Sequence, residues 1–172
     1  MNNQHTTQTL NYYNQNAAQF SDSTQSLDFA SVQDKFLSFL QPQAHILDFG
    51  CGPGRDTKYF LSHGCSTDAI DGSEEFCRIA SEYTGISVKQ MLFKELNASE
   101  EYDGIWACSS ILHSTYDELK DILKKLARAL KKEGILYASF KYGDFEGMRN
   151  GRYFIDMTED KLQRILQEID VF

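Results

Sequence analysis

Five short apolar segments alternate with amphipathic stretches along most of this chain, and the alternation limits the folds that it can adopt. The segments have the length of strands and span residues 45–49, 66–70, 86–91, 102–108 and 134–141. The clearest amphipathic stretch, residues 114–132, repeats leucine, isoleucine and alanine at helical spacing. Its start offers two capping pairs, Ser114 with Asp117 and Thr115 with Glu118. Strands alternating with such helices predict an α/β fold, in which a parallel sheet carries helices on both faces.

The segments outside this alternation extend the prediction toward the two ends of the chain. An apolar stripe predicts a helix from about residue 27 that ends before Pro42. Residues 1–26 are rich in Asn, Gln and Thr, yet they hold more aromatic side chains than a solvated tail needs. After a glycine-punctuated loop over residues 142–156, Thr158 caps a last helix that is apolar on one face.

Composition limits the partners of the chain. Its 172 residues include 17 Lys and Arg against 25 Asp and Glu, a net charge of −8, which argues against a nucleic-acid partner. No apolar run approaches the roughly 18 residues of a membrane-spanning helix, so we expect no membrane partner. The four cysteines lie far apart, with no His at metal-ligand spacing, which predicts reduced thiols in a cytoplasmic protein and no metal site.

The most informative stretch runs from the first apolar segment into a glycine-rich turn. Gly50, Gly52 and Gly54 form this turn, and Pro53 suits the start of the helix that follows. Glycines bring bare backbone against a ligand, because they tolerate positive φ and carry no Cβ. A dinucleotide-binding turn has the spacing G-x-G-x-x-G, whose third glycine would fall where this chain has Arg55.

Two carboxylates narrow the choice of ligand. Asp48 precedes the turn by two residues, where it would repel a pyrophosphate but not the ammonium group of an amino-acid ligand. Asp71 directly follows the second apolar segment, 21 residues after Gly50, and its side chain can accept hydrogen bonds from both hydroxyls of a ribose. An adenosyl ligand without phosphates satisfies both conditions. The alternative is a strand-to-helix turn with a purely structural role.

These motifs resemble those of class I S-adenosylmethionine-dependent methyltransferases. The resemblance rests on residues 47–54 (LDFGCGPG), Asp71 and residues 102–108 (YDGIWAC). Within that class the chain is similar to the small bacterial tellurite-resistance-type methyltransferases, through residues 54–56 (GRD), 106–113 (WACSSILH) and 139–143 (SFKYG). The resemblance covers residues 12–169 and implies a Rossmann-like parallel sheet in the order 3-2-1-4-5. It also implies methyl transfer from S-adenosyl-L-methionine by in-line displacement.

The domain organisation follows from the same resemblance. It implies a single methyltransferase domain over residues 1–172, with an N-terminal lid segment over 1–26 and an α/β core over 27–172. Folds of this class usually end with an antiparallel strand pair, which we expect this chain to lack because its core is truncated at the C-terminal end. The edge of the fifth strand would then be exposed and would favour a homodimer through that edge.

The resemblance further implies a set of cofactor-binding residues. They are Asp48, Gly50, Cys51, Gly52, Gly54, Arg55, Asp71, Gly72, Met91, Leu92, Phe93, Cys108 and Ser109. The glycine turn would approach the methionine part, Asp48 its ammonium group, Asp71 the ribose, and residues 91–93 the adenine. For residues 91–93 a place in the core is the alternative. Arg55, a candidate for the methionine carboxylate, could instead pair with Asp56 or Asp71.

We expect a small and anionic methyl acceptor, reached under a lid. Four residues in or beside the loop before the last helix would bind it: Lys141, Tyr142, Arg149 and Arg152. Three of them are cations that lie close together in an otherwise acidic protein, and cations bind anionic groups. The alternative is that this loop is simply solvated. Tyr13 is a candidate for catalysis and for the lid. His113 is either a general base or a histidine that satisfies backbone groups at the next helix start.

Two other functions remain open from the sequence. A non-catalytic S-adenosylmethionine-binding domain is favoured by the expected loss of the terminal strand pair. A nicotinamide-dependent oxidoreductase would need the third glycine and no carboxylate before the turn, neither of which the chain provides.

Overall fold

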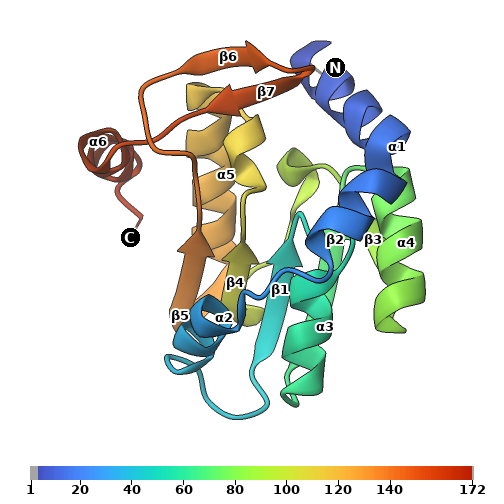
Figure 1. The fold of residues 1–172 in the computed structure, drawn as a ribbon. Coiled ribbons are helices and arrows are strands. Elements are labelled where there is room, and N and C mark those ends of the chain that lie inside the picture. The colour runs from blue at the N-terminus through green and yellow to red at the C-terminus, as the bar shows by residue number, and fades with distance from the viewer. Residues whose placement is uncertain (1–3, 172) are drawn as a thin grey trace.

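The computed structural model describes residues 4–171 and centres on a five-stranded parallel sheet (Figure 1). Residues 1–3 of the predicted lid segment, and residue 172, lie outside this described part. The strands are β1 (His45–Phe49), β2 (Ser66–Asp71), β3 (Lys89–Gln90), β4 (Tyr102–Ala107) and β5 (Leu130–Ala138). Their order, β3-β2-β1-β4-β5, confirms the predicted one. The third strand is much shorter than the predicted segment, residues 86–91.

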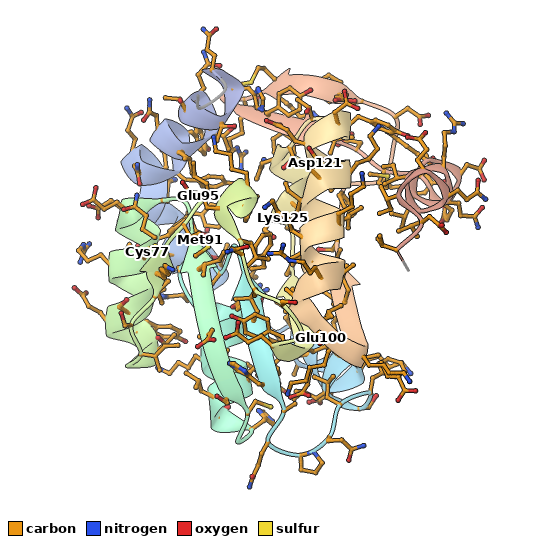
Figure 2. The ribbon with its side chains drawn as sticks, turned by 180° about the vertical axis from the view of Figure 1, so that it is seen from behind. Cys77, Met91, Glu95, Glu100, Asp121 and Lys125 are labelled. Atoms are coloured by element: carbon orange, nitrogen blue, oxygen red, sulfur yellow. The ribbon has the colours of Figure 1, made fainter. Side chains whose placement is uncertain are left out.

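Helices cover both faces of the sheet, as predicted. They are α1 (Gln4–Thr24), α2 (Ala30–Leu37), α3 (Arg55–Ser62), α4 (Glu74–Thr84), α5 (Tyr116–Ala129) and α6 (Glu159–Ile169), with short 3-10 turns η1 (Phe93–Glu95) and η2 (Ile111–His113). Seen from behind, α5 lies across one face of the sheet (Figure 2). In Figure 1, α2 and α3 lie in front of the sheet, on the other face.

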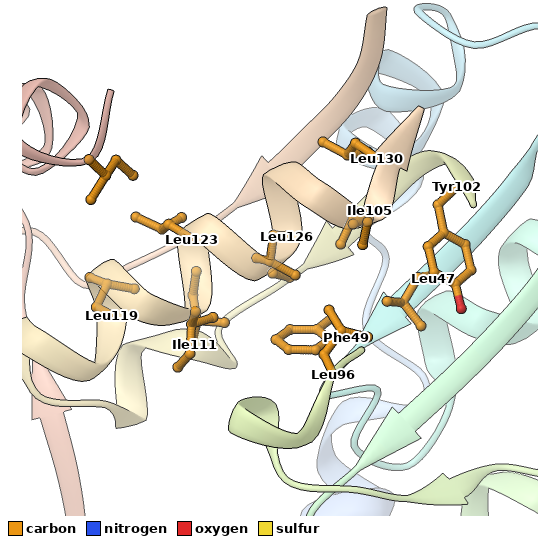
Figure 3. Close-up of a cluster of buried hydrophobic side chains, with 14 of the residues drawn as sticks. Leu47, Phe49, Leu96, Tyr102, Ile105, Ile111, Leu119, Leu123, Leu126 and Leu130 are labelled. Carbon is orange, nitrogen blue, oxygen red and sulfur yellow. The ribbon is translucent and has the colours of Figure 1, made fainter. Parts of the chain in front are cut away.

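Side chains of β1 alternate between these two layers. Leu47 and Phe49 pack with the buried face of α5, and Figure 3 shows this cluster. Ile46 packs instead with Phe36 of α2 and Phe60 of α3. Asp48 shares the face of Ile46, because side chains two residues apart point the same way along a strand. The helix layer of α3 therefore lies over Asp48, which decides the surroundings of that carboxyl group.

The start of α5 carries the predicted capping box. The Thr115 side chain accepts a hydrogen bond from the backbone N–H of Glu118, whose carboxylate accepts one from the Thr115 N–H. Thr115→Ala is expected to lower the free energy of unfolding by about 1 kcal/mol, because the substitution leaves a helix-end N–H without its partner. Urea denaturation measures this loss. Thr115→Ser keeps the hydroxyl and serves as the control, so an equal loss in both variants would contradict the assigned cap.

The expectation that the chain lacks an antiparallel strand pair is wrong. Residues 142–156, predicted to be a loop, contain β6 (Glu146–Arg149) and β7 (Arg152–Ile155), which pair antiparallel. The two residues between them, Asn150 and Gly151, both have positive φ, 49° and 79°. An Asn-Gly pair is the preferred connection of a two-residue hairpin, because it tolerates positive φ at both positions.

This hairpin forms a sheet of its own and packs on α1 rather than extending β5. Phe154 and Ile155 of β7 are buried, and the Tyr153 N–H donates to the Thr9 hydroxyl of α1 at 2.9 Å. A two-stranded hairpin alone is marginally stable in water, so these contacts with the rest of the fold hold it in place.

Most of the predicted lid segment, residues 4–24, forms the long helix α1, which lies across the carboxyl ends of the strands (Figure 1). Several hydrogen bonds tie α1 and its end to the rest of the fold, among them Thr9 with β7, Asn14 with Ser73, and Gln25 with the Pro53 carbonyl. Asn and Thr are weak helix formers, so this helix depends on its tertiary contacts. No helix among residues 4–171 has both the length and the apolar composition needed to cross a bilayer.

Candidate functional site

A cavity of about 580 Å³ lies at the carboxyl ends of the strands, and α1 forms part of its wall. Many predicted ligand residues line it: Tyr13, Gly50, Cys51, Gly52, Arg55, Asp71, Gly72, Met91, Leu92, Phe93, Cys108, Ser109 and His113. This volume lies in the range of small-molecule sites, and the carboxyl ends of parallel strands are where open α/β sheets bind ligands.

The glycine turn needs its glycines for different reasons. Gly50, Gly52 and Gly54 all have positive φ, 82°, 54° and 89°. A Cβ at Gly50 would lie 2.4 Å from the Cβ of Ser110, so the bare backbone lets the turn after β4 approach β1. A Cβ at Gly52 would meet nothing within 4 Å, which leaves this glycine beside open space in the cavity wall. Gly54 packs against α4 and is not part of the cavity lining.

The Asp71 carboxylate faces the cavity from the end of β2. It accepts hydrogen bonds from the backbone N–H groups of Gly52, at 2.9 Å, and Ser73, at 2.8 Å. Burial raises the pKa of Asp71 to about 6, and these N–H bonds limit the rise. The backbone thus fixes the orientation of a carboxylate that retains acceptor capacity for a ligand.

Asp48 is not part of the cavity lining. It is 1% exposed and accepts a hydrogen bond from the Thr57 hydroxyl of α3 at 2.5 Å. Burial, and next the neighbouring Asp56 carboxylate, hold the pKa of Asp48 well above its usual range. The structure thus places the predicted ammonium-binding carboxyl behind the turn, where it joins β1 to α3.

Asp56, which the sequence offered only as a pairing partner, is the central acceptor at one end of the cavity. Its oxygens accept two hydrogen bonds from Arg55, at 2.8 and 2.9 Å, one from Gln33 and one from the Trp106 indole N–H. The Arg55 guanidinium also lies 4.5 Å from the ring centre of Phe29. The signal available in the sequence was the Arg-Asp pair after the glycine turn, whereas its partners come from α2 and β4.

Residues 91–93 belong both to the cavity wall and to the core, the two places that the sequence left open for them. Met91, Leu92 and Phe93 line the cavity, and Figure 2 shows Met91 beside η1. Met91 and Phe93 also pack against the main core, and Phe93 stacks on Phe49 with ring centres 4.6 Å apart. The wall at this end of the cavity is therefore fixed by core packing.

Tyr13 and His113 meet at the cavity wall. Nδ1 of His113 lies 2.6 Å from the Tyr153 carbonyl oxygen, which only accepts, so Nδ1 carries the proton. Nε2 therefore accepts from the Tyr13 hydroxyl at 2.7 Å. Burial lowers the pKa of His113 to about 4, which leaves the imidazole neutral near pH 7, and burial raises the pKa of Tyr13. The pair joins α1 to the segment after β4.

The four predicted acceptor-binding residues lie outside the cavity lining. Arg149 pairs with the buried Asp156 at 2.7 Å, and Tyr142 is 77% exposed. Arg152 donates to the Tyr13 hydroxyl at 3.4 Å, and its guanidinium lies 4.5 Å from the ring centre of Tyr12. Lys141 lies 5.8 Å from the ring centre of Phe154. Arg152 thus contacts a residue of the cavity wall, Tyr13.

Comparisons with known proteins agree with this geometry. A family model described as a methyltransferase domain matches residues 46–134. Malonyl-[acyl-carrier protein] O-methyltransferase of Enterobacter lignolyticus (strain SCF1) is 29% identical over an alignment of 99 residues, and the alignment covers 54% of this chain and 37% of that protein. The match therefore spans little more than a third of the length of this curated relative.

Two solved structures share the fold. One is the 1,6-didemethyltoxoflavin-N1-methyltransferase of Burkholderia thailandensis, solved with 1,6-didemethyltoxoflavin and S-adenosylhomocysteine bound. It superposes with a TM-score of 0.76 and 21% identity, over 93% of this chain and 75% of that one. An S-adenosylmethionine-dependent methyltransferase from Methanosarcina mazei superposes with a TM-score of 0.71 and 20% identity, over 83% and 85% of the two chains. At these identities the likeness establishes the fold.

Proposed function

This chain belongs to the family of methyltransferase domains, and on that premise we propose that it transfers a methyl group from S-adenosylmethionine to a small acceptor. The observation that carries the proposal is the cavity in which the glycine turn, the Asp71 carboxylate and the wall of residues 91–93 face one another. Methyl transfer from S-adenosylmethionine by the purified protein tests it, with small molecules and nucleic acid offered as competing acceptors. Preferential methylation of nucleic acid would contradict a small acceptor.

The residues present fit an adenosyl ligand. The space beside Gly52 accepts a group that a Cβ would displace, and the held Asp71 carboxylate matches the two hydroxyls of a ribose. We propose that adenine lies toward residues 91–93 after β3, and the methionine part toward the glycine turn and Cys108 after β4, all of which the strand order brings to the same cavity. Cys51, Gly72 and Ser109 line the same wall.

The affinity for S-adenosylhomocysteine is expected to fall as the pH is lowered through 6. Asp71 accepts ribose hydroxyls best when ionised, and its pKa of about 6 means that it gains a proton between pH 7 and pH 5. Isothermal titration should give an affinity about tenfold lower at pH 5 than at pH 7. His113, with a pKa of about 4, stays neutral over this range. Asp71→Asn is the control and should bind weakly at both values, so an equal pH dependence in that variant would remove Asp71 as the cause.

S-adenosylmethionine supplies an activated methyl group, so the protein has to orient the acceptor and exclude water. We assign the exclusion of water to α1, whose Tyr13 and Phe20 line the cavity. The Tyr13 hydroxyl donates to His113, so toward an acceptor it presents oxygen lone pairs. Tyr13 and His113 are therefore our candidates for contact with the acceptor.

The proposal of an anionic acceptor rests on Lys141 and Arg152. Neither forms an ion pair with a carboxylate among residues 4–171, whereas Arg149 is neutralised by Asp156. Lys141 and Arg152 both lie near the ring of Phe154, which contacts His113. We propose that these two cations attract the acceptor toward the Tyr13 side of the cavity, with Tyr142 and Arg149 as outer parts of the same surface. Neutral acceptors that outcompete anionic ones would contradict this.

Three finer assignments are proposals of the same kind. The GRD and SSILH segments support membership of the tellurite-resistance-type group, which growth on tellurite with and without the expressed chain would test. Four free cysteines support a cytoplasmic location. The edge of β5, which pairs only with β4 in the five-stranded sheet, supports a homodimer. A monomer in light scattering at all concentrations would exclude the dimer.

A further inference from the structure

Ser109 has a backbone conformation that serine rarely adopts. It lies two residues after β4 and has a φ of 50°. A positive φ is costly for a residue that carries a Cβ, and it persists where the surrounding structure imposes it, often at functional sites. Among residues 4–171, several non-glycine residues have positive φ, and of these Ser109 is the one that lines the cavity. The strained conformation thus occurs where a ligand would bind.

A contact with the end of β5 imposes this conformation. The backbone N–H of Ser109 donates to the Ser139 hydroxyl at 2.8 Å, and the two hydroxyl oxygens lie 3.3 Å apart. Ser139 directly follows β5, and its own N–H donates to the Ala107 carbonyl. The parallel pairing of β4 with β5 therefore sets the position of Ser139. Ser139 holds the turn that carries Ser109, although Ser139 itself is not part of the cavity lining.

The Ser109 hydroxyl keeps hydrogen-bonding capacity toward the cavity. A serine hydroxyl has one proton and two acceptor lone pairs. Ser139 is its partner among the described residues, so when Ser139 donates to Ser109, the proton of Ser109 remains for a ligand. The next residue, Ser110, differs, because it is 6% exposed and donates to the Phe49 carbonyl at 2.6 Å. Of these two neighbours, Ser109 is the exposed one and can meet a ligand.

The pair of Ser109 and Ser139 lies on the β5 side of the cavity. The residues proposed for the cofactor lie at the carboxyl ends of β1, β2 and β3 and at Cys108, whereas Ser139 belongs to β5, the next strand beyond β4. His113, a candidate for contact with the acceptor, lines the same cavity four residues after Ser109. Lys141, one of the two cations proposed to attract the acceptor, follows Ser139 by two residues. The sequence assigned Ser109 to the cofactor, but these neighbours favour the acceptor.

We propose that the Ser109 hydroxyl donates a hydrogen bond to an anionic oxygen of the methyl acceptor, and that Ser139 is the positioning residue that holds Ser109 there. The inference rests on the proposed function, because it narrows the anionic acceptor to an oxyanion, such as a carboxylate or a phosphate, bound at the ends of β4 and β5. A hydrogen bond to a charged oxygen is stronger than one between neutral groups. This interaction offsets the cost of keeping serine in a strained conformation.

Ser109→Gly separates the structural role of this residue from its contact with the acceptor. Glycine adopts a φ of 50° without strain and keeps the backbone N–H that donates to Ser139, but it has no hydroxyl. We therefore expect a urea midpoint at least as high as that of the natural chain. The affinity for S-adenosylhomocysteine should stay close to that of the natural chain, because the backbone of the cavity wall is kept.

The contact with the acceptor is measured by titrating oxyanion probes into the protein saturated with S-adenosylhomocysteine. Benzoate and inorganic phosphate are added separately, at an ionic strength held constant with chloride, and the backbone amide signals are followed by NMR. At least one probe should shift the amide signals of Ser109 and Ser139 to saturation. In Ser109→Gly the same probe should bind about tenfold more weakly, the effect of losing one hydrogen bond to a charged group.

The positioning role of Ser139 has its own pair of variants. Ser139→Ala should weaken binding of the same probe by about threefold or more, because the Ser109 turn loses its anchor. Ser139→Thr keeps the hydroxyl and should restore the affinity. Ser62→Ala is the matched control, since the Ser62 hydroxyl also bonds to a backbone carbonyl, that of Tyr59, but lies on α3 away from the cavity lining. It should leave the affinity for the probe unchanged.

The outcomes separate this inference from the proposed function. If the natural chain does not bind S-adenosylhomocysteine, the proposed function fails. If it binds S-adenosylhomocysteine but neither probe, or if Ser109→Gly binds the probe as tightly as the natural chain, the proposed function stands and the contact of Ser109 with the acceptor is overturned. If Ser109→Gly weakens the probe but Ser139→Ala does not, the positioning role of Ser139 is overturned.

Discussion

Gly52→Ala is expected to leave the protein folded and to weaken the binding of S-adenosylhomocysteine by about 10- to 100-fold, the cost of forcing a methyl group into occupied space. A Cβ at this position meets no protein atom within 4 Å, so the fold itself has room for it. Gly52 itself lines the cavity, so we expect the added methyl group to meet the bound ligand. The folded state should lose only about 1–2 kcal/mol, because alanine is strained at a φ of 54°.

Gly50→Ala provides the matched comparison within the same turn. Its Cβ would lie 2.4 Å from that of Ser110, whose hydroxyl donates to the Phe49 carbonyl, so this substitution should destabilise the fold itself. We expect a loss of about 2–5 kcal/mol, from the strained φ and the overpacking together. Urea denaturation and ligand titration on both variants separate the two effects. Gly52→Ala with normal affinity would contradict the placement of the ligand against this turn.

Asp56→Ala is expected to lower the free energy of unfolding by about 3–5 kcal/mol, as the removal of one partner from a buried ion pair does. The substitution leaves Arg55, Gln33 and the Trp106 N–H without their acceptor, and Trp106 is fully buried. These groups cannot all turn toward water, so their hydrogen bonds are lost without replacement.

Glu82→Ala is the control for this loss. Glu82 pairs with Arg78 on the exposed surface of α4, where both side chains are more than half exposed. Exposed pairs contribute little, so we expect a change of about 0.5 kcal/mol or less. Urea denaturation of both variants measures the contrast. A loss below about 1 kcal/mol in Asp56→Ala would show that the network around Asp56 does not hold α2, α3 and β4 together.

The sequence predicted those parts of the fold that local patterns specify. The apolar segments predicted the five strands, and the capping box at Thr115 predicted the start of α5. The hairpin of β6 and β7 was not predicted, although the pair Asn150-Gly151 is typical of a two-residue hairpin turn. It was missed because the flanking strands are only four residues long and their apolar pattern is weak. Helix α1 was missed as a helix because its stability comes from contacts with distant parts of the chain.

The same distinction, between local patterns and long-range contacts, applies to the residues of the candidate site. The glycine turn and Asp71 could be predicted, since their spacing along the chain carries the information. The burial of Asp48 depends on which face of β1 it occupies and on the helix above that face, α3. The Asp56 network could not be predicted, because Gln33 and Trp106 lie 23 and 50 residues away from Asp56 in the sequence.

The measurement that most directly tests the central claim is a calorimetric titration of the protein with S-adenosylhomocysteine and with NAD, repeated on Asp71→Ala. The account predicts binding of one S-adenosylhomocysteine per chain and no comparable binding of NAD. Asp71→Ala should bind S-adenosylhomocysteine about 10- to 100-fold more weakly, the effect of losing hydrogen bonds to a charged group. An unchanged affinity in Asp71→Ala, or tighter binding of NAD than of S-adenosylhomocysteine, would contradict it.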